Sequence, residues 1–190
     1  LAAAAETALD EARLAHGEIV TYSTPRRMIL VVEDLADASE ALSMCAKGPA
    51  AAIAFDDAGN PTKAAEGFAR CKGVDVSRLV RETDESGKEY VYAQVEEPSR
   101  KTADLLPELL ANLVGGIGWP KSQRWGSGHV TFSRPIRWLM ALYGEDVIPV
   151  EYAGLVAGRI SRGNRLMADR EFEFASAADL PGAYEEMRVI

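Results

Sequence analysis

The order of apolar and polar residues predicts helices in three parts of the chain. Residues 1–15 place alanine and leucine on one face, and residues 101–114 carry a stripe of five leucines. The second of these helices should begin after an N-cap at Thr102, whose hydroxyl can accept a bond from a free amide. Residues 176–188 should form the third helix, with a capping residue near its start.

Strands are predicted where β-branched residues cluster or where apolar and polar residues alternate. Residues 28–32 form an apolar run that is typical of a buried strand. Residues 80–96 alternate on both sides of a turn at 85–88, which indicates a β-hairpin. Residues 129–132 and 147–152 are two further strand candidates.

Two segments have a weaker pattern. Residues 136–143 fit a strand, but they also fit a helix that begins at Pro135, because their large apolar residues recur with a period near 3.6 residues. We favour a helix or a mixed segment here, and we expect Trp138 to be largely buried and Trp125 less so. Residues 36–50 are rich in alanine and serine, and we expect a linker or a short helix.

A short segment between the first strand and the hairpin carries its own boundary signals. Asn60 suits an N-cap, and Pro61 suits the first helical turn. Gly73 suits the residue that follows a helix, and Asp75 can cap a second, shorter helix. Residues 47–80 are therefore expected to form a small helical module.

These elements together predict an α+β fold, with a mixed or antiparallel sheet packed against helices. We expect residues 1–46 and 81–190 to form the main body and residues 47–80 to be inserted in it. No apolar run approaches the ~20 residues that cross a bilayer, so we expect no membrane contact.

Positive charge is concentrated in one segment of an acidic chain. The 190 residues carry a net charge of −8, yet residues 119–144 hold three tryptophans and four cations without a single acid. Such a segment can bind an anion, and arginine forks commonly bind phosphate. The alternative is a buried strand that is flanked by structural ion pairs.

The sequence lacks the usual signs of an active site. Only two histidines are present, and neither lies in a metal-binding or triad motif. The two cysteines have no metal-ligand spacing, and they suit a reduced, cytoplasmic compartment. The glycine run at 115–118 follows a predicted helix instead of a strand, so it does not indicate a phosphate-binding loop. We therefore predict no catalytic residue and no metal ligand.

A series of longer motifs carries a family resemblance. The motifs are TPRR at 24–27, KGPA at 47–50, FDDAGNPTKAAEGFAR at 55–70, KSQRWGSG at 121–128, FSRPIRWLMALYG at 132–144 and SRGNR at 161–165. In this order they resemble the N-terminal part of the β subunit of the bacterial two-subunit glycyl-tRNA synthetase. Three positions depart from the family pattern: Gln123 stands where methionine is favoured, Asn164 where histidine is favoured and Leu166 where phenylalanine is favoured.

The resemblance implies part of a cytoplasmic aminoacyl-tRNA synthetase, a ligase of protein biosynthesis. The implied enzyme is an α2β2 heterotetramer that attaches glycine to tRNA(Gly) with ATP. It implies that nucleotide binding, with ATP and Mg, occurs at the α subunit and that this part binds no cofactor. The implied partners are the α subunit, tRNA(Gly) and further β subunits.

Combining the cationic segments with this resemblance, we predict a set of tRNA-binding residues. They are Arg26, Arg27, Lys63, Lys121, Arg124, Trp125, Arg134, Arg137, Arg162 and Arg165. Two alternatives stay open, a purely structural or assembly module and a remnant editing-type domain. Exposed arginines without partners would favour RNA, whereas buried arginines paired with carboxylates would favour assembly.

Overall fold

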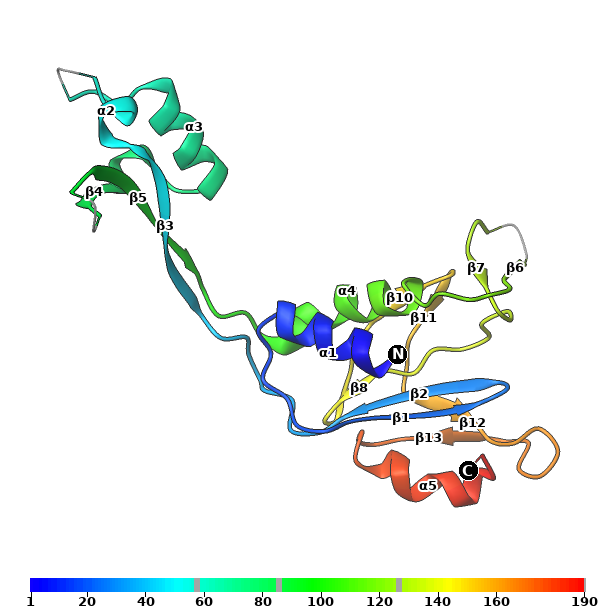
Figure 1. Ribbon diagram of the computed structural model, residues 1–190. Helices are drawn as coiled ribbons and strands as arrows, with labels where there is room; N and C mark the ends of the chain where they lie inside the picture. The colour runs from blue at the N-terminus through cyan, green and yellow to red at the C-terminus, as the bar shows by residue number, and fades with distance from the viewer. Residues whose placement is uncertain (57–58, 85–86, 126–127, 190) are drawn as a thin grey trace. The chain divides into compact units, whose positions relative to one another are not determined.

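A computed structural model describes residues 1–56, 59–84, 87–125 and 128–189 (Figure 1). The chain divides into two compact units, one of Leu1–Ser39 with Arg100–Ile190 and one of Glu40–Ser99. Helices and antiparallel strand pairs occur in both units, which confirms the α+β prediction. Among the described residues, no helix has the length and apolar character needed to span a lipid bilayer.

The smaller unit is a three-stranded antiparallel sheet, in the order β3-β5-β4, with helices packed against it. Its elements are β3 (Leu42–Ala50), α2 (Ala51–Ala54), α3 (Lys63–Lys72), the 3-10 helix η1 (Val76–Arg78), β4 (Leu79–Thr83) and β5 (Glu89–Glu97). Its core is small: Ala51, Ala54, Ala65 and Val91 are buried against one another. The expected module at 47–80 lies inside this unit, which also contains β5 and the rest of β3. The predicted hairpin is present, although turn residues 85–86 lie outside the described residues.

Strand β3 corrects the expectation of a linker or short helix at 36–50. It pairs with β5 from Leu42↔Glu97 to Lys47↔Tyr92. Most of its side chains are exposed or half-buried, so no apolar alternation marks the strand in the sequence. Alanine, lysine, glycine and proline, which make up much of this segment, are depleted in strands, so pairing with β5 sets its conformation.

The start of α3 differs from the prediction, whereas its end agrees. Asn60 is not the N-cap, because its side-chain and backbone amides both donate to Asp56. Thr62 takes that role and accepts a bond from the Ala64 amide at 3.2 Å. Gly73 ends the helix with φ of 66°, as expected, and Asp75 caps η1.

The larger unit contains three longer helices and several short strand pairs. The helices are α1 (Ala2–Glu11), α4 (Thr102–Gly115) and α5 (Asp179–Met187), which confirms the three predicted helices. The antiparallel pairs are β1 (Ile19–Thr24) with β2 (Arg27–Val32), β6 (Gln123–Arg124) with β7 (Thr131–Phe132), β8 (Leu142–Tyr143) with β9 (Asp146–Val147), β10 (Glu151–Tyr152) with β11 (Leu155–Val156), and β12 (Ile160–Arg162) with β13 (Glu171–Glu173).

Two apolar clusters hold this unit together. Leu106 of α4 packs with Ile148, Val150 and Ala157, so the leucine stripe covers the chain around β9 to β11. The second cluster is formed by Phe174 and the apolar face of α5, with Ile29 of β2 packed against it. Because their apolar faces are buried in these two clusters, α4 and α5 pack on different strand segments of one unit.

Several local predictions for this unit were wrong. Residues 136–143 form no helix, because Gly158 donates to the Leu139 carbonyl at 3.2 Å and its own carbonyl accepts from Ala141 at 3.2 Å. Residues 147–152 are divided between β9 and β10, which pair with different neighbours. Thr102 is not an N-cap, since it is buried and its hydroxyl donates to the Ala36 carbonyl. For residues 136–143 and for Thr102, a backbone partner far away in the sequence outweighs the local pattern.

Candidate nucleic-acid interface

The larger unit contains a hollow of about 2190 Å³. Its walls come from strand β2, the segment 132–146, the end of β12 with the loop that follows it, and the inner faces of α4 and α5. These segments are far apart in the sequence, and the two apolar clusters bring them together.

Six of the ten predicted tRNA-binding residues line this one hollow, and we call it the arginine hollow. They are Arg26, Arg27, Arg134, Arg137, Arg162 and Arg165. They come from the turn of the β1–β2 hairpin, from the segment before Trp138, and from the end of β12 with its following loop. The fold therefore gathers three separate basic motifs around one space.

Four of these arginines are exposed and unpaired. Within the described part of the chain, the side chains of Arg26, Arg134, Arg137 and Arg165 make no hydrogen bond or ion pair. Guanidinium groups in this state are available to an anionic ligand. By the criterion set from the sequence, exposed and unpartnered arginines favour RNA over internal ion pairing.

The remaining two arginines meet at Trp138. The guanidinium carbon of Arg27 lies 5.7 Å from the centre of the Trp138 ring, and that of Arg162 lies 5.9 Å from it. Arg162 also pairs with Glu171 at 3.0 Å. Arg27 donates to the Arg162 carbonyl, so the three side chains form one cluster. Trp138 is half-buried here, and so is Trp125.

Arg27 is the most strongly desolvated cation of the cluster. Its Nε and Nη1 atoms are buried without a hydrogen-bond partner, and so is the hydroxyl of Tyr184. Burial lowers the pKa of the Arg27 guanidinium, although the neighbouring Tyr184 opposes the shift. Unsatisfied buried donors are costly, and an anionic oxygen that reached them would relieve that cost.

The arginine hollow is polarised along strand β2. Arg26 and Arg27 precede the strand's apolar residues, whereas Glu33 and Asp34 follow them. At ~3.3 Å per residue, six strand residues separate the two ends by roughly 17–20 Å. The acidic end is also marked by Asp37, which accepts a bond of 2.6 Å from the Tyr143 hydroxyl. The hydrogen bond raises the pKa of Tyr143 to about 12.

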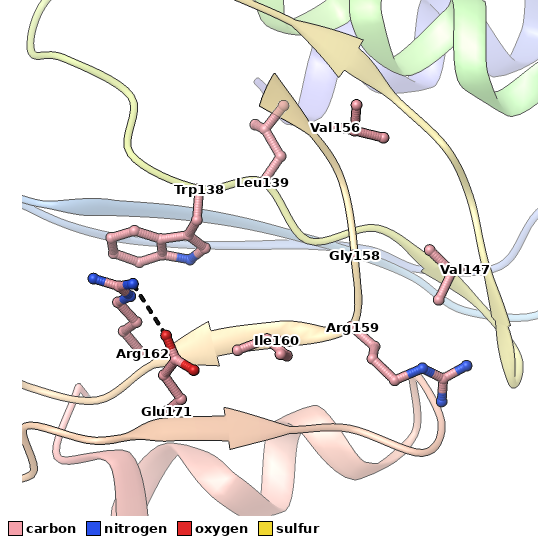
Figure 2. Close-up of a pocket in the computed structure, with 9 residues that line it drawn as sticks. All are labelled: Trp138, Leu139, Val147, Val156, Gly158, Arg159, Ile160, Arg162 and Glu171. Atoms are coloured by element: carbon pink, nitrogen blue, oxygen red, sulfur yellow. Dashed lines mark hydrogen bonds and ion pairs between the residues drawn. The ribbon is translucent and has the colours of Figure 1, made fainter. Parts of the chain in front are cut away.

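A smaller hollow of about 470 Å³ adjoins the Trp138 cluster (Figure 2). We call it the tryptophan hollow, and it is lined by Trp138, Leu139, Val147, Val156, Gly158, Arg159, Ile160, Arg162 and Glu171. Figure 2 shows the Arg162 guanidinium beside the indole, with its ion pair to Glu171 closing one side. Trp138, Leu139 and Arg162 line both hollows, so the two spaces share a wall.

The other four predicted residues lie elsewhere. Lys121 and Arg124 are exposed near β6, and Trp125 follows them. Lys63 is exposed at the start of α3 in the smaller unit. Their RNA contacts stay a prediction, as do those of the arginines in the hollow.

Sequence reasoning missed Glu171 and Tyr184. Glu171 reaches Arg162 because the two residues are opposite each other in the β12–β13 register, and no local motif signals that pairing. Tyr184 was predicted only to lie in a helix, and no contact with an arginine was predicted for it. Among the described residues, no group of three histidine, cysteine or acidic side chains is placed to hold a metal ion.

Comparison with known proteins decides the family. A family model described as "Glycyl-tRNA synthetase beta subunit" matches residues 1–190. The chain belongs to this family. The glycyl-tRNA synthetase beta subunit resemblance is thereby confirmed, and the TPRR, RPIRWL and SRGNR motifs that supply the arginine hollow are part of the matched region.

Individual relatives of the glycyl-tRNA synthetase beta subunit family agree. The chain is 48% identical over 163 residues to the "Glycine--tRNA ligase beta subunit" of Citrifermentans bemidjiense, covering 86% of this chain and 24% of that protein. It is 43% identical over 190 residues to the protein of the same name from Moorella thermoacetica, covering 100% of this chain and 27% of that protein. A protein of Arabidopsis thaliana, "Glycine--tRNA ligase, chloroplastic/mitochondrial 2", is 46% identical over 158 residues, covering 83% of this chain and 14% of that protein. The chain thus spans about a quarter of the length of these bacterial relatives.

Proposed function

We propose that this chain is part of the β subunit of a glycine–tRNA ligase and that its arginine hollow binds tRNA phosphates. The enzyme would work in the cytoplasm as an α2β2 assembly, joining glycine to tRNA(Gly) with ATP. The α subunit would bind ATP with Mg and perform the chemistry. The present residues would hold the RNA and contribute to contact with the α subunit.

The observation that carries this proposal is the set of four unpaired arginines around one hollow. Arg26, Arg134, Arg137 and Arg165 are exposed on a chain whose net charge is −8. An acidic protein offers many carboxylates, and yet these arginines pair with none of those described. Phosphate groups of RNA suit the planar donor fork of arginine, and such contacts set affinity and register.

The test is the salt dependence of tRNA binding by the full two-subunit enzyme. A variant that combines Arg134→Ala and Arg165→Ala removes two exposed, unpaired cations from the arginine hollow. Each lost phosphate contact should reduce the slope of log K against log salt by roughly 0.7–0.9, the counterion-release value for single- and double-stranded nucleic acid. We therefore expect a weaker affinity and a slope smaller by about 1.5.

The matched control combines Arg100→Ala and Arg188→Ala. Both arginines are exposed in the same unit, and neither lines the hollow. The control loses the same total charge, so it should lower affinity only through the overall field and leave the slope nearly unchanged. An unchanged slope in the Arg134/Arg165 variant would refute the phosphate contacts. If that variant instead lost its association with the α subunit, the assembly alternative would be supported.

A further inference from the structure

The tryptophan hollow differs from the arginine hollow in its chemistry. Its volume of about 470 Å³ lies within the ~300–1,000 Å³ that is typical of small-ligand sites. Much of its wall is apolar, and two of its aliphatic side chains are well exposed, Val156 at 61% and Ile160 at 43%. A group that covered these surfaces would remove apolar area from water.

The charges around the tryptophan hollow are already compensated. Arg162 pairs with Glu171 at 3.0 Å. Arg159 donates to the carbonyls of Phe174 at 3.2 Å and Glu145 at 3.3 Å, and Figure 2 shows its guanidinium turned away from Trp138. No cation that lines this hollow is left without a partner, so an uncharged group suits it better than a phosphate does.

The polar edge of the hollow offers both kinds of hydrogen-bonding group. The side chains of Arg162 and Glu171 are 56% and 58% exposed, and their ion pair uses one nitrogen and one carboxylate oxygen. Further guanidinium donors and the second carboxylate oxygen therefore lie next to each other at the rim. A flat group with donors and acceptors along its edge would match them.

We propose that the tryptophan hollow binds an unpaired nucleobase of the RNA whose phosphates lie in the arginine hollow. Proteins recognise unpaired RNA bases by stacking them on aromatic rings or guanidinium planes and by bonding their polar edges. Trp138 and Arg162 supply the planes, and the Arg162–Glu171 pair supplies the bonds. An apolar side chain from a partner protein would fill the same walls but leave the polar edge unused. The inference rests on the proposed function, because the shared wall places the base beside the bound phosphates.

Gly158 provides a way to obstruct the hollow without disturbing the protein around it. Gly158 lines the hollow, and a Cβ built there would meet no heavy atom within 4 Å. Gly158→Leu should therefore fold normally and occupy space that the base needs. Gly118→Leu is the matched control, because a Cβ at Gly118 also meets nothing within 4 Å and Gly118 lines neither hollow.

The experiment measures tRNA binding by the full two-subunit enzyme over a range of salt concentrations. Loss of a stacked base should raise the Kd of Gly158→Leu by about 5- to 150-fold, which is the range known for base–aromatic contacts. The slope of log K against log salt should stay unchanged, because no phosphate contact is removed. Gly118→Leu should bind like the unmodified enzyme, and thermal unfolding checks that both variants fold.

A second pair of variants tests the stacking surface itself. Trp138→Phe keeps an aromatic face, so its Kd should remain within about threefold of the unmodified value, whereas Trp138→Leu should weaken binding as Gly158→Leu does. A leucine that bound as well as phenylalanine would show that the hollow takes an aliphatic group, and this would overturn the proposal.

The outcomes separate this inference from the proposed function. If the Arg134/Arg165 variant shows the reduced salt slope while Gly158→Leu binds tRNA normally, the base site is wrong and the phosphate site stands. If Gly158→Leu weakens association with the α subunit and leaves tRNA affinity intact, the hollow is a protein contact and the base site is again wrong. If the Arg134/Arg165 slope is unchanged, the proposed function itself fails.

Discussion

A methyl group at Gly163 should collide with the backbone that shapes the loop after β12. A Cβ at this position would lie 2.1 Å from the carbonyl oxygen of Ala168 and 2.9 Å from the ring of Phe172. The first of these atoms belongs to the backbone, so it cannot move aside as the end of a flexible side chain would. Gly163→Ala should therefore open the loop that carries Arg165.

The size of the effect follows from the bonds that the loop makes. Three backbone amides of the loop donate to backbone carbonyls: Gly163 to Arg170 at 3.0 Å, Asn164 to Met187 at 2.7 Å, and Ala168 to Asn164 at 2.8 Å. Inserting an extra methyl into a packed site typically costs about 1–3 kcal/mol. If local opening carries that cost, exchange of these amides should be about 5- to 150-fold faster.

Hydrogen exchange followed by mass spectrometry on the full-length chain measures this directly. Peptides that contain Asn164 and Ala168 should exchange faster in Gly163→Ala, and tRNA affinity should fall because Arg165 is no longer held. Gly118→Ala, where a Cβ meets no atom within 4 Å, is the control and should leave both quantities unchanged. Equal exchange in the two variants would show that the close approach of Ala168 to Gly163 does not constrain the loop.

Two further predictions concern the packing and the acidic end of the larger unit. Leu106 is 5% exposed on the buried face of α4, so Leu106→Ala should destabilise the unit by about 2–5 kcal/mol. Leu166 is 92% exposed, so Leu166→Ala should change the free energy of unfolding by no more than about 0.5 kcal/mol. Similar midpoints of denaturant unfolding for the two variants would refute the assigned core. The hydrogen bond to Asp37 raises the pKa of Tyr143 to about 12, so the folded state keeps this proton above the ordinary tyrosine pKa near 10. The contribution of this hydrogen bond to folding stability should therefore be fully present below pH ~10 and should fall as the pH rises toward 12. The test compares how the unfolding midpoints of the unmodified chain and of Tyr143→Phe change with pH. The variant should show a smaller fall in midpoint between pH ~10 and 12.

The sequence predicted those elements whose signals are local. The leucine stripe marked α4, and Gly73 marked the end of α3, because both depend on residues one or two turns apart. Strand β3 and the 136–143 segment were missed, since their conformation depends on β5 and on Gly158. Partners more than ten residues away leave no periodic trace in a segment rich in alanine, serine or mixed apolar residues.

The candidate site was predicted in its residues but not in its geometry. Arginine chemistry and the family motifs pointed to Arg134 and Arg165. Their lack of partners could not be inferred, because ion pairing depends on which strands become neighbours. Arg162 shows the converse: its partner Glu171 is set by the β12–β13 register alone. The cations beside Trp138 could not be inferred for the same reason, since they come from β2 and β12.

The separation of charge along β2 gives the arginine hollow a direction. A ligand that is negative along its whole length is attracted at the end with Arg26 and Arg27 and repelled at the end with Glu33 and Asp34. Such a ligand would enter from one side and stop before the far side, instead of passing through. The ligand would therefore dock at a fixed position and would not slide along the strand. The distance between the basic and acidic ends would then set which region of the RNA fits this surface.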